Sequence, residues 1–197
     1  MALSLKKQTI VILANSHNPS IFREKWLEAH GIFSSEELGE LTYASQFCQV
    51  QGPISLFVVP DRLQLLAAGE ADAADMATKA TVIVDALGET PYYAVGFNFD
   101  WSYESDEASL KELAEKKFAP PAASLIGDAT FGTVAVSTIG SARRTVNIRP
   151  AGEALSIGLN YHYDLDVADS KASALAAISQ WPSNAENASD LVQALFR

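Results

Sequence analysis

Two stretches of the chain alternate polar residues with apolar ones. In AVGFNFDW (94–101) and SIGLNYHY (156–163), every second residue is apolar or aromatic, and the residues between are small or polar. Because side chains in a strand alternate between two faces, each stretch is predicted to be a strand with one packed face and one polar face. The polar residues are Asn98, Asp100, Asn160, His162 and Asp164.

These five polar side chains suggest binding chemistry if the two strands lie together. Histidine and aspartate are metal ligands, and His162 and Asp164 share one strand face, although a closed site would need a third ligand from a neighbouring strand. Gly96 and Gly158 would let a small ligand approach the backbone. The simpler interpretation, which we favour, is a face in contact with water or a partner and without catalysis.

The segment SARRTVNIRP is a local basic cluster in an acidic chain. Arg143 and Arg149 share one strand face with Thr145 and Asn147, so the two guanidinium groups could hold a carboxylate or phosphate. Alternatively they pair with neighbouring carboxylates, or protect an exposed strand from aggregation. We favour this second interpretation.

Other chemistry is absent from the sequence or is better explained by structure. No serine-elbow, P-loop, HExxH or dinucleotide-binding motif occurs, so we predict no catalytic residue, no metal ion and no cofactor. Cys48 is the single cysteine and is expected to be a buried apolar residue, while His17 and His30 lack spaced partners. The net charge of −10 disfavours nucleic-acid binding, which needs a concentrated positive surface.

Apolar periodicity and turn residues predict the secondary structure. The first half is expected to contain a strand (8–14), a helix (18–31) begun by Asn18 and Pro19, strands (41–50, 54–59, 62–68) and a helix (70–87). The second half is expected to contain a strand (92–103), a helix (106–118) ended by Pro120 and Pro121, strands (130–139, 143–149, 154–165) and a helical tail. The tail is interrupted at Trp181-Pro182, and Ser183 or Asn184 is expected to cap its last helix.

This order is β-α-β-β-β-α, repeated once. We therefore predict an α+β fold in which two related halves, 1–88 and 89–197, pack as one compact unit. They would share a curved, mostly antiparallel sheet with helices on one face. In element order the chain resembles the duplicated saddle of the TATA-binding protein family, or paired helix-grip units. That resemblance implies a fold and no function.

The function predicted from these features is non-enzymatic. We expect an interaction or assembly protein that binds itself or a protein partner through an exposed sheet face or edge. The alternative is a small-ligand-binding or metal-binding protein, or an enzyme, that uses the polar strand face. No apolar run approaches the ~20 residues of a membrane span, and TIVILA (9–14) is too short for a signal peptide, so a soluble cytoplasmic protein is expected.

Overall fold

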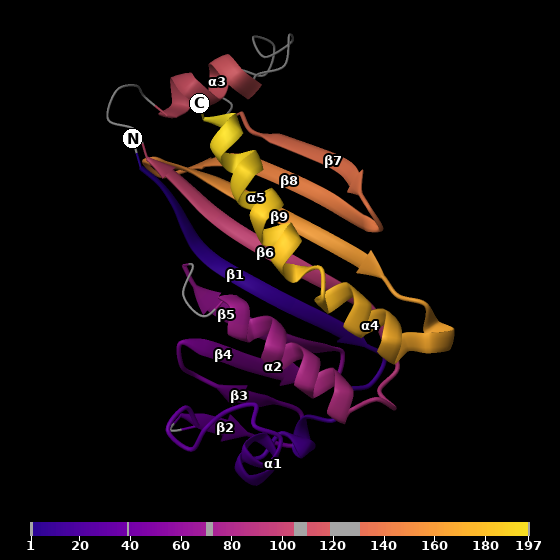
Figure 1. Cartoon of the computed structure of the whole chain (residues 1–197). Helices are drawn as coiled ribbons and strands as arrows, with labels where there is room; N and C mark the ends of the chain where they lie inside the picture. Colours follow the sequence, from indigo (N-terminus) through magenta and orange to yellow (C-terminus); the bar gives the residue numbers. More distant parts are fainter. Residues whose placement is uncertain (1, 39, 70–72, 105–109, 119–130, 197) are drawn as a thin grey trace.

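A computed structural model describes residues 2–38, 40–69, 73–104, 110–118 and 131–196. Within these ranges the chain is a mixed α+β protein with five α-helices and one nine-stranded antiparallel sheet, in the strand order β2-β3-β4-β5-β1-β6-β9-β8-β7 (Figure 1). The prediction of an α+β fold with a largely antiparallel sheet is therefore confirmed.

Short connections explain much of this strand order. The strands of the first half are β1 (Ala2–Ala14), β2 (Leu41–Tyr43), β3 (Cys48–Val50), β4 (Ile54–Val59) and β5 (Arg62–Ala68). Those of the second half are β6 (Tyr92–Glu104), β7 (Thr133–Ile139), β8 (Ala142–Ala151) and β9 (Ala154–Asp164). Gly140 and Gly152 have φ values of 56° and 62° in the turns between β7 and β8 and between β8 and β9, a conformation that tight hairpins require.

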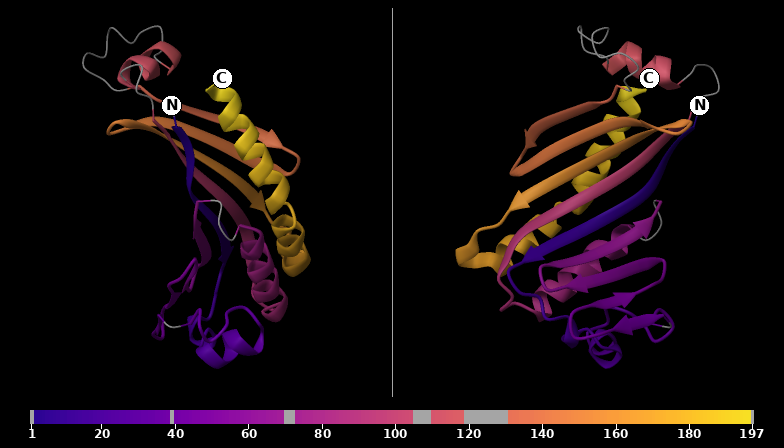
Figure 2. Two further views of the ribbon diagram at one scale, coloured as in Figure 1. Left: turned by 60° about the vertical axis from the view of Figure 1, so that its left-hand side comes forward. Right: turned by 180° about the vertical axis from the view of Figure 1, so that it is seen from behind.

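The longest helices cover one face of the sheet. The helices are α1 (Glu24–Ala29), α2 (Ala73–Ala86), α3 (Leu110–Phe118), α4 (Ser170–Ile178) and α5 (Trp181–Leu195). In Figure 2, α2, α4 and α5 lie along the same side of the twisted sheet, whereas α1 lies at its β2 end and α3 lies near both chain termini. On the opposite side, called here the helix-free face, none of the described helices runs along the central strands.

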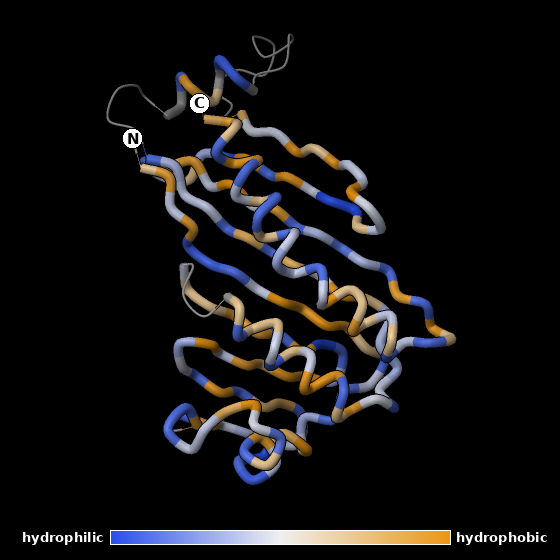
Figure 3. Tube along the Cα trace, in the orientation of Figure 1, coloured by the Kyte–Doolittle hydropathy of each residue, from blue (hydrophilic) through white to orange (hydrophobic). Residues whose placement is uncertain are grey.

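Alternation along the strands decides which side chains the helices cover. Figure 3 shows apolar and polar residues alternating along β6 and β9. Phe97 and Phe99 of β6 turn toward α5, where their ring centroids lie 5.2 and 4.9 Å from that of Trp181. At the end of α5, Phe196 stacks on Tyr103 at 4.2 Å. These rings, all buried except the half-buried Phe196, contribute hydrophobic burial together with aromatic pairing, and they hold α5 on the sheet.

The structure corrects several predicted elements in the first half. The predicted strand 41–50 is two short strands, β2 and β3, paired antiparallel as a hairpin. The predicted helix 18–31 is a 3-10 turn (Pro19–Ile21) followed by α1, because Phe22 leaves the helical conformation and is fully buried. β1 begins at Ala2, six positions before the prediction, because β6 is long enough to pair with all of it.

The helical tail also differs from the prediction. α5 begins at Trp181 with Pro182 in its first turn, so neither Ser183 nor Asn184 is its cap. Asn184 instead donates a hydrogen bond to the hydroxyl of Tyr163, at 2.6 Å. The predicted start of the second-half helix and its end at Pro120 and Pro121 lie outside the described residues.

None of the helices in the described ranges is both long enough and apolar enough to cross a membrane.

Candidate functional site

The two alternating strands are neighbours, and their polar residues share the helix-free face. β6 pairs antiparallel with β9, and Asn98 lies directly opposite Asn160. Because paired residues of adjacent strands point to the same side, the register defines rows of side chains that cross the sheet. One row is Thr9, Asn98, Asn160, Thr145 and Val136, and the next is Lys7, Asp100, Gly158, Asn147 and Val134.

A shallow hollow lies where these two rows cross β6, β9 and β8. It has a volume of about 220 Å³ and is lined by Asn98, Asp100, Thr145, Asn147, Gly158, Leu159 and Asn160. Gly158 forms part of its floor, because a Cβ added there would lie 3.6 Å from Oδ1 of Asp100. Asn160 Nδ2 donates to Asn98 Oδ1 at 2.8 Å, which fixes the orientation of both amides. The arrangement suits hydrogen bonding to a small polar group.

Two pairs of ionisable side chains of the face lie near this hollow. Lys7 Nζ lies 3.5 Å from Asp100 Oδ2, and both side chains are about half exposed. His162 Nε2 lies 3.0 Å from Asp164 Oδ1, but the Asp164 side chain is 92% exposed. In the described part of the chain no group of three histidine, cysteine, aspartate or glutamate side chains is placed to hold a metal ion. The face therefore offers polar contacts without a built metal centre.

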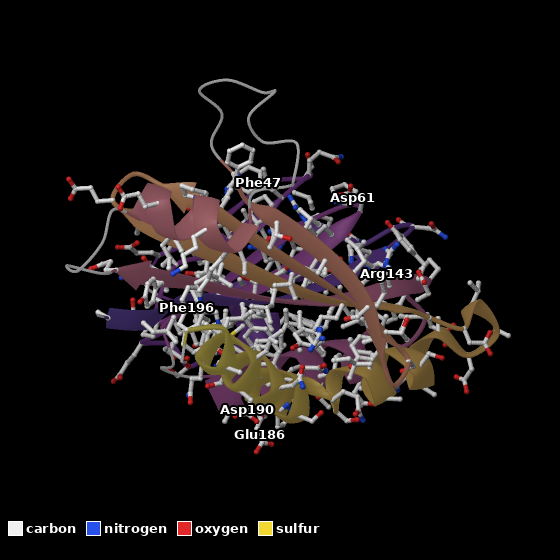
Figure 4. The ribbon with its side chains drawn as sticks, turned by 90° about the horizontal axis from the view of Figure 1, so that it is seen from above. Phe47, Asp61, Arg143, Glu186, Asp190 and Phe196 are labelled. Carbon is white, nitrogen blue, oxygen red and sulfur yellow. The ribbon has the colours of Figure 1, made fainter. Side chains whose placement is uncertain are left out.

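Arg143 and Arg149 lie on the same face of β8, farther from the centre of the sheet. Arg143 is opposite His162 of β9 and Thr138 of β7, and Arg149 is opposite Ser156. Both arginines are exposed, and neither has an ion pair among the described residues. In Figure 4, Arg143 lies beside the strands, while Glu186 and Asp190 lie on the outer side of α5.

Arg144, which lies between Arg143 and Arg149 in the sequence, points to the helix-covered face and has a structural role. Its Nη1 donates to Asn187 Oδ1 on α5 at 3.0 Å, and its Nε donates to Ser137 Oγ at 3.1 Å. Asn187 Oδ1 also accepts from the buried hydroxyl of Tyr161 at 2.8 Å. Burial raises the pKa of Tyr161. The alternation of β8 therefore separates one structural arginine from two exposed ones.

An exposed sheet face or edge was expected from the sequence, but β7 was not identified as an outer strand. Val134 and Val136 are 66% and 65% exposed, among the highest values for large apolar side chains in the described residues. β7 reads TVAVSTI and carries neither a charge nor a proline along its seven residues. The sequence signal was present, since an uncharged β-branched run is typical of strand pairing. The position of β7 as the outer strand of the described sheet depends on strand order.

A larger hollow of about 800 Å³ lies at the other end of the sheet. Its walls are the loop before β2, with Glu36, Glu37 and Glu40, and side chains of β3–β5 that include Phe57. Glu37 is already engaged, because Lys79 Nζ donates to its Oε1 at 3.1 Å. Burial raises the pKa of Glu37, but hydrogen bonds from Ser34 and Lys79 outweigh it, and the pKa lies below its ordinary value.

The cysteine and the first histidine are buried. Cys48 Sγ donates to the Phe22 carbonyl oxygen at 3.2 Å, and burial raises the pKa of its thiol to about 11, which suppresses thiolate chemistry. His17 Nε2 lies 3.2 Å from the Ile12 carbonyl oxygen, and burial lowers the pKa of the ring. His30 is exposed, with Nδ1 2.8 Å from the Trp26 carbonyl oxygen. Each of these residues has a local structural contact.

No protein-family model matches the chain, and no curated protein matches its sequence.

Proposed function

We propose that this chain is a non-enzymatic interaction protein that docks another polypeptide at the β7 edge by strand addition. In this mode an extended segment hydrogen-bonds to the free main-chain groups of an edge strand, and side chains on either face set specificity. The observation that carries the proposal is the length, exposure and lack of charge of β7.

The two edges of the sheet support this assignment by their contrast. β2 has three residues, and the guanidinium of Arg23 lies 4.9 Å from the ring centroid of its last residue, Tyr43, which is 48% exposed. Short strands and nearby charges are the usual protection of an edge. β7 has seven residues, none of them charged, and exposes Val134 and Val136. It therefore lacks the short length that protects β2, and the charges beside it are the arginines of β8.

The helix-free face favours docking at this edge over face-to-face stacking of sheets. Stacked sheets need an apolar inner face. The central rows of this face contain Asn98, Asp100, Asn160 and Thr145, and one of their contacts is the exposed pair of Lys7 with Asp100. An added strand would cover the valines of β7 and leave these polar groups in water.

We also propose that the two halves, 1–88 and 89–197, arose by duplication. The supporting observation is the strand order, since β5, β4 and β3 follow β1 outward on one side as β9, β8 and β7 follow β6 on the other. Among the described residues the second half has no counterpart of β2, and β7 is its outer strand.

The test of docking at the edge is a peptide-display selection against the immobilised chain, with Val136→Asp as the blocking variant. An aspartate on β7 disfavours an added strand through its charge and its low β-propensity. The matched control is Val167→Asp, at a valine that is 72% exposed and lies outside the sheet. Selected peptides should bind the parent and control chains equally and lose at least tenfold in affinity for Val136→Asp.

Light scattering on the same variants tests for self-association, because the polypeptide that docks at β7 could be a second copy of this chain. A dimer that Val136→Asp dissociates would support docking at β7. If the peptides bind Val136→Asp as tightly as the parent chain, and all the variants are monomers, docking at β7 is rejected.

A second candidate function is binding of a small polar ligand in the hollow beside Gly158. The observation that favours it is the hydrogen-bonded Asn98–Asn160 pair, whose remaining amide atoms border this hollow. A thermal-shift screen of small polyols, amides and anions tests it, because a ligand of the native state raises the melting temperature. Gly158→Val should fill the hollow and abolish any shift, and a shift that survives this substitution would place the ligand elsewhere.

A further inference from the structure

The charge around the β7 edge differs from that of the chain as a whole. The net charge is −10, yet β8, the neighbour of β7, carries three arginines and no acidic residue. Arg144 is occupied by Asn187 and Ser137 on the helix-covered face. Arg143 and Arg149 remain exposed on the helix-free face, so the edge has a local positive character on that side.

The register places only small residues between these two arginines and the free edge. Thr138 of β7 is the partner of Arg143. Gly132, just before β7, lies against Arg149, and a Cβ added to it would lie 3.3 Å from the Arg149 Cα and overlap the Ile148 carbonyl oxygen. Each guanidinium can therefore extend toward the edge without crossing a large side chain.

The two exposed valines lie between these positions on the same face. Val134 is the partner of Asn147, and Val136 is the partner of Thr145. From one end of the edge to the other, the helix-free face presents Arg149 with Gly132, then Val134, then Val136, then Thr138 with Arg143. Along the edge the side chains are therefore positively charged, apolar, apolar and positively charged.

An added strand would lie within reach of both arginines. Neighbouring strands are about 4.8 Å apart, so a strand paired with β7 would run about 10 Å from β8. The long side chain of arginine and the carboxylate of a glutamate or aspartate together span this gap over Thr138 or Gly132. Arginine binds carboxylates with two parallel hydrogen bonds, which gives such a contact directional preference.

We infer that β7 binds an extended acidic segment of a partner protein with the pattern acid–x–apolar–x–apolar–x–acid. Its two acidic residues would meet Arg143 and Arg149, and its two apolar residues would cover Val134 and Val136. The pattern reads the same in both directions, so it suits a parallel or an antiparallel segment. This inference rests on the proposed docking at β7 and adds the chemistry of the partner.

The same charges argue against a second copy of this chain as the occupant. Pairing β7 with β7 of another copy would bring together two strips that each carry Arg143 and Arg149. Like charges placed together across an interface are unfavourable. Hence an acidic segment of a different protein fits the edge better.

The test is binding of two fluorescein-labelled synthetic peptides to the whole chain, measured by fluorescence anisotropy. One contains Glu-Thr-Val-Thr-Val-Thr-Glu between glycine-serine ends, and the other has lysine in place of both glutamates. The acidic peptide should bind at least tenfold more tightly, and its advantage should shrink as salt rises from 50 to ~500 mM. Hydrogen exchange should show protection of the β7 amides when it binds.

Reversing the charge of one arginine at a time tests whether that arginine binds the acidic peptide. Arg143→Glu and Arg149→Glu should each weaken the acidic peptide at least tenfold and should strengthen the lysine peptide. The matched control is Arg62→Glu, which makes the same charge change at an exposed position of β5, in the other half of the sheet. Its affinity for the acidic peptide should stay within twofold of the parent. Thermal melts of all three variants confirm that they fold.

The outcomes separate this inference from the proposed function. If both peptides bind equally and protect β7, the edge docks strands but does not select acidic ones, and the inference is wrong while the function stands. If the acidic peptide binds without protecting β7, or if Arg62→Glu weakens it as much as the other reversals, the inference is also wrong. If neither peptide binds and the chain forms a dimer that Val136→Asp dissociates, the occupant is a second copy.

Discussion

Asn160 donates a 2.8 Å hydrogen bond to Asn98 across β6 and β9, at positions far apart in the sequence. The pair links the last strand of the second half to its first strand, on the face that no helix covers. Both side chains are half-buried, so each depends on the other for part of its hydrogen bonding.

A double-mutant cycle on this pair should give a coupling free energy of about 1 kcal/mol. Asn98→Ala, Asn160→Ala and the double variant would be compared by urea unfolding. Asn147→Ala, an exposed amide on the same face, serves as the control and should change stability by less than about 0.5 kcal/mol. Strict additivity of the two single variants would show that the amides act independently.

Asn187 joins α5 to the sheet by accepting from both Tyr161 and Arg144. Asn187→Ala should lower the free energy of unfolding by about 2 kcal/mol, because it leaves the Tyr161 hydroxyl without its acceptor. Asn187→Asp retains an acceptor beside Arg144 and should stay close to the parent. Chemical denaturation of both variants makes the comparison. Equal losses would mean that the acceptor is unimportant and that packing of α5 alone matters.

Lys79 of α2 is a buried cation that contacts the loop following α1. Its Nζ lies 3.1 Å from Glu37 Oε1 and 3.2 Å from Asp75 Oδ2, and it donates to the Ile32 carbonyl oxygen. Glu37→Gln and Asp75→Asn should each cost about 1 kcal/mol, because the remaining carboxylate still balances the ammonium group. The double variant should cost about 3 kcal/mol, more than the sum, since it leaves a buried charge unpaired. Urea unfolding at pH 7 measures all three.

His17 should make stability depend on pH in the mildly acidic range. Burial lowers its pKa below the ordinary value of 6.5, opposed by the Ile12 carbonyl and the Asp61 carboxylate. As the pH falls below about 6.5, the unfolded chain takes up a proton at this ring and the folded chain does not. The free energy of unfolding therefore decreases as the pH decreases, and this group contributes at most about 1.4 kcal/mol per pH unit.

The measurement is urea unfolding of the parent and of His17→Gln at intervals between pH 7.5 and 5. The substitution should flatten the profile in this window, whatever it does to stability at pH 7.5. An identical slope in the two chains would show that His17 is not the group that titrates.

Local patterns identified most elements and both faces of the key strands. Alternation in β6 and β9 distinguished the aromatic positions from Asn98 and Asn160, because period two is a property of the extended chain itself. Predictions failed where distant contacts overrode the local pattern. The helix predicted at 18–31 breaks because Phe22 fits the core, and the strand predicted at 41–50 turns back on itself to pair β2 with β3.

Taken by itself, the sequence determined which residues alternate, where the turns fall and that Arg143 and Arg149 share a face. Only the tertiary structure decided that β6 lies beside β9, that β7 is the last strand and that its valines are exposed. The physical reason is that pairing between distant strands depends on how all the helices and strands bury their apolar faces together, which no local pattern encodes. The outer position of β7 in the described sheet, on which the proposed function depends, follows from strand order.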